Sequence, residues 1–158
     1  MHWFGFDFLL VASAAENGLL AGASLDQSVK QLPARHTIGH VAYSKYSRAA
    51  DLASGVLLYS ALGGGAALLA VAAAWAARTV GLPSDVRLPL YAGAAVAKMH
   101  SVCTTQAAPT LFRQQRVSGN ETALKDVFDR FQRWQNARCA LQLIGFGISL
   151  WSLWVYVH

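Results

Sequence analysis

Four long apolar stretches alternate with polar segments along the chain. They cover residues 3–25, 52–77, 88–112 and 136–157. About twenty apolar residues in an α-helix cross the hydrocarbon core of a bilayer, so each stretch is long enough to span it. The third stretch is less apolar than the others and is interrupted late by Pro109. The pattern predicts an all-α, polytopic membrane protein, a single domain over residues 1–158 in which four transmembrane helices form a bundle.

The connections between these stretches differ in length. Residues 26–51 and 113–135 are long and polar, whereas residues 78–87 form a short, turn-like link. Within the second long connection, four apolar residues recur at helical spacing: Leu124, Val127, Phe128 and Phe131. We predict an amphipathic helix lying on the membrane surface, capped by Asn120 or Glu121. The alternative is a solvated helix that continues into the fourth span.

Composition and charge support a membrane location. The chain is 54% hydrophobic and 13% charged, against roughly 25% charged in an ordinary soluble domain. Most of its Lys and Arg residues lie in the two long connections, and the formal net charge is +5. The positive-inside rule predicts that the long connections are cytoplasmic and both termini lie opposite, as in a bacterial-type inner membrane. The basic residues would then face anionic lipid, so we expect no nucleic-acid partner.

Small residues in the apolar stretches predict close helix packing. Gly18 and Gly22 form a GxxxG pattern in the first stretch. In the second, a triple glycine at 63–65 precedes a ridge of alanines: Ala66, Ala70, Ala73 and Ala77. Small residues let helix backbones approach closely in lipid, where hydrophobic attraction between helices is lost. A compact bundle is therefore expected.

A carboxylate inside the first apolar stretch needs explanation. Placing Glu16 in hydrocarbon costs about 2.5–3.5 kcal/mol, so such a residue usually faces a bundle interior and has a partner. At about 1.5 Å rise per residue, several polar residues of the other stretches lie at a similar depth. The predicted polar pocket comprises Glu16, Asn17, Lys98, His100, Thr104, Arg138 and Gln142. The alternative is a structural ion pair between Glu16 and Lys98 or Arg138.

No metal or cofactor is expected. His36 and His40 have the i, i+4 spacing of helical metal ligands, but Gly39 weakens a helix there and surface histidines are the commoner case. Cys103 and Cys139 form no CxxC pair, which argues against a zinc site or a disulfide framework. Both cysteines are expected to be small buried side chains.

Three short motifs resemble a known family. They are ENGLLAGAS at residues 16–24 followed by Pro33, the proline at 109 that closes the third stretch, and FQRWQNAR at residues 131–138. With the four-span layout, they are similar to the DUF1772 or anthrone oxygenase-like membrane proteins. The resemblance implies a membrane oxygenase (a monooxygenase-type oxidoreductase) that needs no cofactor and oxidises a polycyclic phenolic substrate with O2.

The resemblance implies catalytic roles that we assign to the candidate residues. An anthrone carries an acidic C–H, and the enolate formed by deprotonation reacts with dioxygen, so the site needs a base and an oxyanion partner. We assign the base to Glu16 or His100 and the oxyanion partner to Arg138, Asn136 or Lys98. The remaining substrate contacts are expected from Asn17, Thr104, Gln142 and Trp134, with Phe112 or Phe146 also beside the rings.

Two other classes of function fit the same sequence. The chain could be a non-catalytic membrane subunit or a module that binds a lipid or small molecule, alone, as a homo-oligomer or in a larger complex. It could also be a small transporter with a proton relay through Glu16, Lys98 and His100. No internal repeat is evident to support transport.

Overall fold

A computed structural model describes residues 4–158, and this part of the chain contains helices but no strand. The all-α prediction is confirmed. The elements in chain order are α1 (Phe4–Asp26), the π-helix η1 (Gln27–Gln31), α2 (Arg35–Ile38), α3 (His40–Ala49), the π-helix η2 (Ala50–Ser54), α4 (Gly55–Thr79), α5 (Ser84–Phe112), the 3-10 helix η3 (Arg113–Gln115) and α6 (Glu121–Val157).

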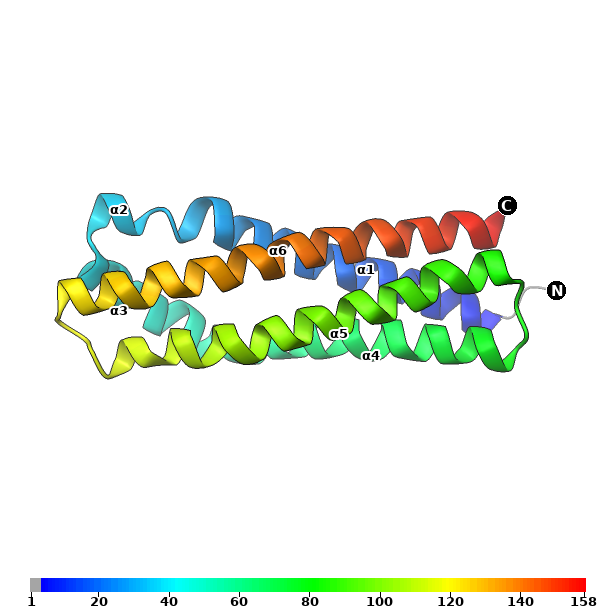
Figure 1. The fold of residues 1–158 in the computed structure, drawn as a ribbon, viewed down its shortest axis with the longest axis horizontal. Coiled ribbons are helices and arrows are strands. Elements are labelled where there is room, and N and C mark those ends of the chain that lie inside the picture. The colour runs from blue at the N-terminus through cyan, green and yellow to red at the C-terminus, as the bar shows by residue number, and fades with distance from the viewer. Residues whose placement is uncertain (1–3) are drawn as a thin grey trace.

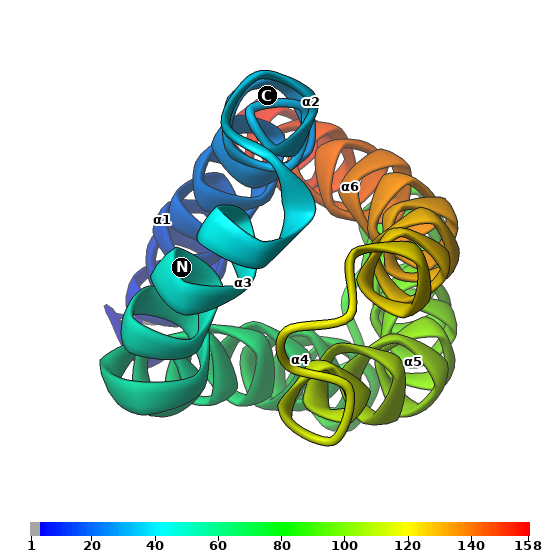
Figure 2. The same cartoon turned by 90° about the vertical axis from the view of Figure 1, so that its left-hand side faces the viewer.

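Four long rods run side by side to make an elongated bundle (Figure 1). In cyclic order α1 packs against α4, α4 against α5, α5 against α6, and α6 against α1, as the end view also shows (Figure 2). The start of α1 and the end of α6 lie at the same end as the short α4–α5 turn, which we call the terminal end. The two long connections lie at the other, distal end.

The first long connection is largely helical. It turns at Gly39, whose φ of 86° and ψ of 151° are accessible to glycine and strained for other residues. From His40 the chain is helical without interruption to Thr79, because η2 joins α3 to α4. The expected turn at residues 78–87 is also present, between Thr79 and Ser84.

Three helices are long and apolar enough to cross a membrane: Gly5–Ile38, His40–Thr79 and Glu121–Val157. α5 is not among them. The expected interruption of the third stretch at Pro109 is wrong, since α5 continues through this residue to Phe112. Many large apolar side chains face outward on the bundle, among them Leu57, Phe8 and Leu68, which are 78%, 74% and 73% exposed. An apolar outer surface of this kind indicates association with a lipid bilayer.

The amphipathic segment of the second connection is the first part of α6 and does not form a separate helix. α6 runs unbroken from Glu121 to Val157, so the continuous-helix alternative is confirmed. Its apolar face packs on the first connection: Phe128 is fully buried and its ring lies 4.9 Å from that of Tyr43. Burial against a neighbouring helix satisfies the apolar face without lipid. The predicted cap is present, because Asn120 Oδ1 accepts a hydrogen bond from the Ala123 amide at 3.0 Å.

Two apolar clusters hold the ends of the bundle together. The one at the terminal end includes Phe6, Leu10 and Leu90, and the one at the distal end includes Leu32 and Phe128. The alanine ridge of α4 is buried as predicted, from 0% exposure at Ala77 to 9% at Ala70. The GxxxG prediction is only half right. Gly18 contacts Phe146, but Gly22 is exposed with no atom near its Cβ position.

Candidate functional site

Polar side chains recur at spacings of three, four or seven residues along the inner face of α6. Residues at these spacings share one face of a helix, so the sequence places them in a line along the interior. Gln135, Gln142 and Ser152 are 1%, 4% and 2% exposed. Buried polar groups on α1 and η1 accompany this line; they are Ser13 and Ser24 on α1 and Gln27 on η1.

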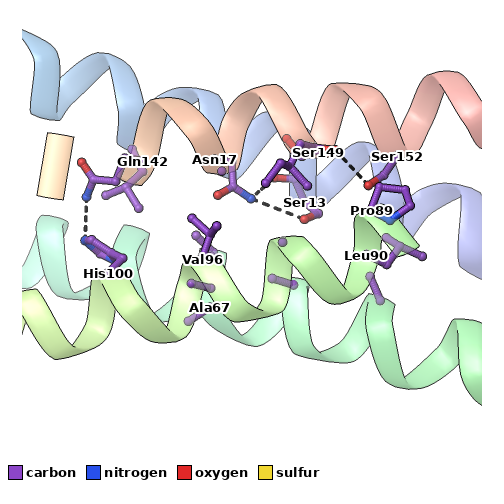
Figure 3. A pocket seen from close by; sticks show the side chains of 18 of the residues that line it. Ser13, Asn17, Ala67, Pro89, Leu90, Val96, His100, Gln142, Ser149 and Ser152 are labelled. Atoms are coloured by element: carbon purple, nitrogen blue, oxygen red, sulfur yellow. Dashed lines mark hydrogen bonds between the residues drawn. The ribbon is translucent and has the colours of Figure 1, made fainter. Parts of the chain in front are cut away.

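His100 and Gln142 meet in the middle of the bundle. Their Nε2 atoms are 2.7 Å apart, and His100 is 7% exposed (Figure 3). One turn further along α5, the Thr104 hydroxyl donates to the His100 carbonyl oxygen at 3.0 Å and lies 3.4 Å from its Nε2. The structure thus brings together three residues of the predicted pocket. Asn17 lines the same interior cavity as His100 and Gln142, and its Nδ2 donates to the Ser13 carbonyl.

Arg138 lies on the distal side of this group. Its Nη1 donates to Gln135 Oε1 at 3.1 Å, whereas its Nε is buried without a hydrogen-bond partner among the described residues. None of the ion pairs within residues 4–158 includes Arg138. A buried guanidinium normally has an anionic partner, because its desolvation is expensive. Arg138 is half-buried and has no such partner within residues 4–158, so it can attract an anion into the bundle.

A cavity of about 140 Å³ adjoins Arg138. Part of its wall is polar, with Thr104, Tyr59, Ser60, Asp51 and Gln27 beside Arg138. The rest is apolar, formed by Leu52, Val56, Ala108, Leu111, Phe112 and Phe131. A cavity with one charged, polar wall and one apolar wall suits an amphipathic molecule.

Asp51 is a second buried charge-bearing group at the distal edge of this cavity. It is 6% exposed, accepts a 2.6 Å hydrogen bond from Ser47 Oγ and a 3.5 Å bond from Gln27 Nε2. No ion pair joins Asp51 to Arg138 in the described chain. These hydrogen bonds satisfy the carboxyl group locally, so the Arg138 guanidinium stays available to another group.

Glu16 does not lie with the other residues of the predicted polar pocket. It is half-buried against α4, where a methyl group added to Gly65 would come within 2.7 Å of its Oε1. Glu16 forms no ion pair with any residue of 4–158, so the predicted structural pair with Lys98 or Arg138 is absent. It lines neither the cavity at His100 nor the one at Arg138. The helices are rotated so that Glu16 faces Gly65.

Three more candidates lie apart from the interior. Lys98 and Asn136 are exposed on the outside of the bundle. Trp134 is half-buried and packs against the apolar cluster at the distal end. The depth estimate places these residues at the right level but not on the inner face, because depth leaves the rotation of a helix undetermined.

His36 and His40 do not share a helix, since Gly39 separates α2 from α3. Their ring centroids are 5.9 Å apart, and His40 Nδ1 lies 2.8 Å from Glu121 Oε1. The same carboxylate accepts hydrogen bonds from the backbone N–H groups of His40 and Val41 at 2.7 and 3.1 Å. Glu121 therefore caps the start of α3. No group of three or more potential ligands that could hold a metal occurs within residues 4–158.

Sequence reasoning missed two residues that line the cavity beside Arg138, Tyr59 and Asp51. Tyr59 is the one tyrosine in the second apolar stretch, and Asp51 is the acid that immediately precedes it. Both could be seen in the sequence as isolated polar residues. Helical spacing relates residues of one helix only, and Arg138 is more than 75 residues further along the chain.

No protein-family model, curated protein or solved structure matches this chain. The functional argument therefore depends on the site itself.

Proposed function

We propose that this chain is an integral membrane protein that binds a small amphipathic molecule, with an anionic oxygen of the ligand held by Arg138. One observation carries the proposal: a guanidinium inside the bundle has no anionic partner among residues 4–158 and borders a cavity. A carboxylate, phenolate or enolate oxygen would pair with it in a low-dielectric setting, where such bonds are strong. The Tyr59 and Thr104 side chains border the same cavity and can hydrogen-bond to the ligand.

The cavity size limits the ligand. An engineered apolar cavity of about 150 Å³ holds benzene, so the cavity of about 140 Å³ at Arg138 suits a single ring or a short branched chain. Its apolar wall, including Phe112 and Phe131, would cover the ring or chain. The ligand class is thus a ring-sized amphiphile with one acidic oxygen.

Four membrane spans are the topology we infer for this site. α5 is less apolar than the other long helices, but it packs along both α4 and α6 (Figure 1). If its two neighbours cross the bilayer, α5 crosses it with them. Its polar residues His100 and Thr110 are buried in the bundle, where they are shielded from lipid. By the positive-inside rule, the distal end would be cytoplasmic and the termini would lie on the other side.

The anthrone oxygenase-like activity is a second candidate, favoured by the position of His100. Thr104 contacts this imidazole and also lines the cavity at Arg138, so a base on α5 lies close to the cavity that an oxyanion partner on α6 borders. His100, and not Glu16, would remove the substrate proton, and Arg138 would hold the enolate oxygen. A tricyclic anthrone exceeds the size of this cavity, so the reaction requires the helices to separate further on binding.

Binding measurements on the purified protein in nanodiscs test the proposal. Benzoate and 4-alkylphenols should bind, and benzyl alcohol, which has a similar size but no acidic oxygen, should bind much more weakly. Arg138→Met should abolish the preference for benzoate, while Arg133→Met, which changes an exposed arginine of α6, should leave it intact. Equal benzoate affinity in wild type and Arg138→Met would refute the site.

Oxygen consumption distinguishes the second candidate. If the protein is an oxygenase, wild type should consume O2 with an anthrone substrate, and His100→Ala should lose this activity while Glu16→Gln keeps it. If the protein binds benzoate but consumes no O2 with an anthrone substrate, the result would support a ligand-binding module and contradict the oxygenase activity.

A further inference from the structure

A second cavity lies between the four long helices, on the terminal side of His100. It has a volume of about 40 Å³ and is bordered by residues from Pro89 to His100 on α5, a length of about 16 Å at 1.5 Å per residue. Small side chains of α4 and α5, such as Ala70, Gly93 and Ala97, leave this space open. A water molecule needs about 10–15 Å³ by this measure, so the cavity has room for roughly three.

Polar groups follow the cavity along its length. Figure 3 shows His100 facing Gln142 near one end, Asn17 and Ser13 beyond them, and Ser149 and Ser152 further toward the terminal end. They belong to three different helices, α1, α5 and α6. Water in a buried cavity needs two to four polar partners, and these side chains supply them.

The side-chain amide of Gln142 requires a partner that the protein does not provide. Gln142 is 4% exposed, and its nitrogen contacts His100 while its oxygen Oε1 has no hydrogen-bond partner in the described residues. If the side-chain amide is flipped, its oxygen contacts His100 and its nitrogen is the atom without a hydrogen-bond partner. An unsatisfied buried amide end costs about 1–3 kcal/mol.

In two other buried glutamines of this bundle, both the nitrogen and the oxygen of the side-chain amide have hydrogen-bond partners. Gln114 donates to Ser47 Oγ and accepts from Ser44 Oγ, and it is fully buried. Gln135 donates to Ser24 Oγ and accepts from Arg138. Gln142 differs from both because one end of its amide has no hydrogen-bond partner among residues 4–158.

We propose that this cavity is a water-binding site, in which a short file of about three water molecules satisfies Gln142 and hydrates the Gln142–His100 pair from the terminal side. The file extends from this pair toward Asn17 and Ser13. It is separate from the ligand cavity at Arg138, which lies on the distal side of His100. The proposal therefore stands whether or not a ligand binds at Arg138.

Water-edited solid-state NMR of the ¹⁵N-labelled full chain in bilayers tests this inference. Magnetisation from water should reach the Gln142 side-chain amide and the His100 ring nitrogens several times faster than the side-chain amide of Gln114. Gln114 is the matched control because it is at least as buried but bonded at both ends. Build-up at Gln142 as slow as at Gln114 would mean a dry cavity and would overturn the proposal.

A blocking variant tests the direction of the path. Ala97 borders the cavity one turn from His100 on the terminal side, so Ala97→Leu should fill it and slow the transfer to Gln142 to the Gln114 rate. Arg138→Met, at the other cavity, should leave this transfer rapid. Rapid transfer that persists in Ala97→Leu and disappears in Arg138→Met would place the water on the distal side and contradict the proposed path.

Discussion

Two arginines in the interior of this bundle should respond differently to the same substitution. Arg35 is 2% exposed and its guanidinium makes three hydrogen bonds, one of them to a carboxylate, whereas the half-buried Arg138 makes one, to an amide; the Nε of each has no hydrogen-bond partner within residues 4–158. Methionine keeps much of the length and apolar volume of an arginine stem but removes the charge. We expect Arg35→Met to destabilise the protein strongly and Arg138→Met to leave its stability nearly unchanged.

The cost at Arg35 follows from its partners. Its guanidinium donates to the Leu32 carbonyl at 2.7 Å, to Asp129 at 2.9 Å and to Gln132. The Leu32 carbonyl keeps a hydrogen bond from the backbone N–H of residue 35 at 3.3 Å, so the main loss is that of the hydrogen bonds to the charged guanidinium, each of which contributes about 1.5–3 kcal/mol. Asp129 keeps Lys125 as a partner and is not stranded. A total near 3 kcal/mol corresponds to a decrease in Tm of about 6–12 °C.

At Arg138 the opposing contributions are similar in size. Removing its bond to Gln135 costs about 1–3 kcal/mol. Removing an arginine from a membrane helix relieves up to about 2.5–3.5 kcal/mol, and less near the membrane boundary. The midpoints of the two ranges, about 2 and about 3 kcal/mol, nearly cancel, so the net change should be about 1 kcal/mol.

Thermal unfolding in detergent, followed by circular dichroism, measures both variants, with Arg133→Met as the exposed control. The reasoning predicts a large drop in Tm for Arg35→Met and changes of a few degrees at most for the other two. If Arg138→Met lowers Tm as much as Arg35→Met, Arg138 is a structural residue and the proposed ligand role loses its basis.

Two further predictions concern the distal end. Gly39→Ala should destabilise the protein by about 1–3 kcal/mol, because alanine is strained at φ 86°, whereas Gly22→Ala in the open face of α1 should be neutral or slightly stabilising; thermal unfolding of the pair compares them. Hydrogen bonds, the first from the backbone N–H of His40, hold the pKa of Glu121 below its ordinary value of 4.5. The stability that Glu121 contributes is complete above pH 4.5 and is lost as the pH falls through its lowered pKa, so wild type and Glu121→Gln should converge in stability at low pH, and a constant difference between them would contradict the assignment.

Part of the candidate site could be predicted from the sequence. His100 and Gln142 were grouped because each is polar and lies deep in an apolar stretch, and the structure joins them by a 2.7 Å contact. Arg138 and Gln142 are four residues apart, which placed them on one face of α6. Those inferences needed only the rise and periodicity of a helix.

Other members could not be predicted in this way. Glu16 has the right depth but faces Gly65, and Lys98 has the right depth but is exposed. The rotation of each helix is set by packing all of its faces at once, and the small residues of α4 permit several rotations. Tyr59 lines the same cavity as Arg138 because of how α4 and α6 are rotated, and no local sequence pattern encodes that rotation.

By itself, the sequence determined the all-helical architecture, the approximate bounds of α1 and α5, the C-terminal ends of α4 and α6, and the shared face of Arg138 and Gln142 on α6. Each of these depends on hydrophobicity and on a period of 3.6 residues, which are local properties of the chain. Only the tertiary structure decided which polar residues meet, which carboxylate stays apart, and that the amphipathic end of α6 is buried on α3. These outcomes depend on helix rotation and side-chain volume, since an apolar face is satisfied equally by lipid or by a neighbouring helix until the packing selects one.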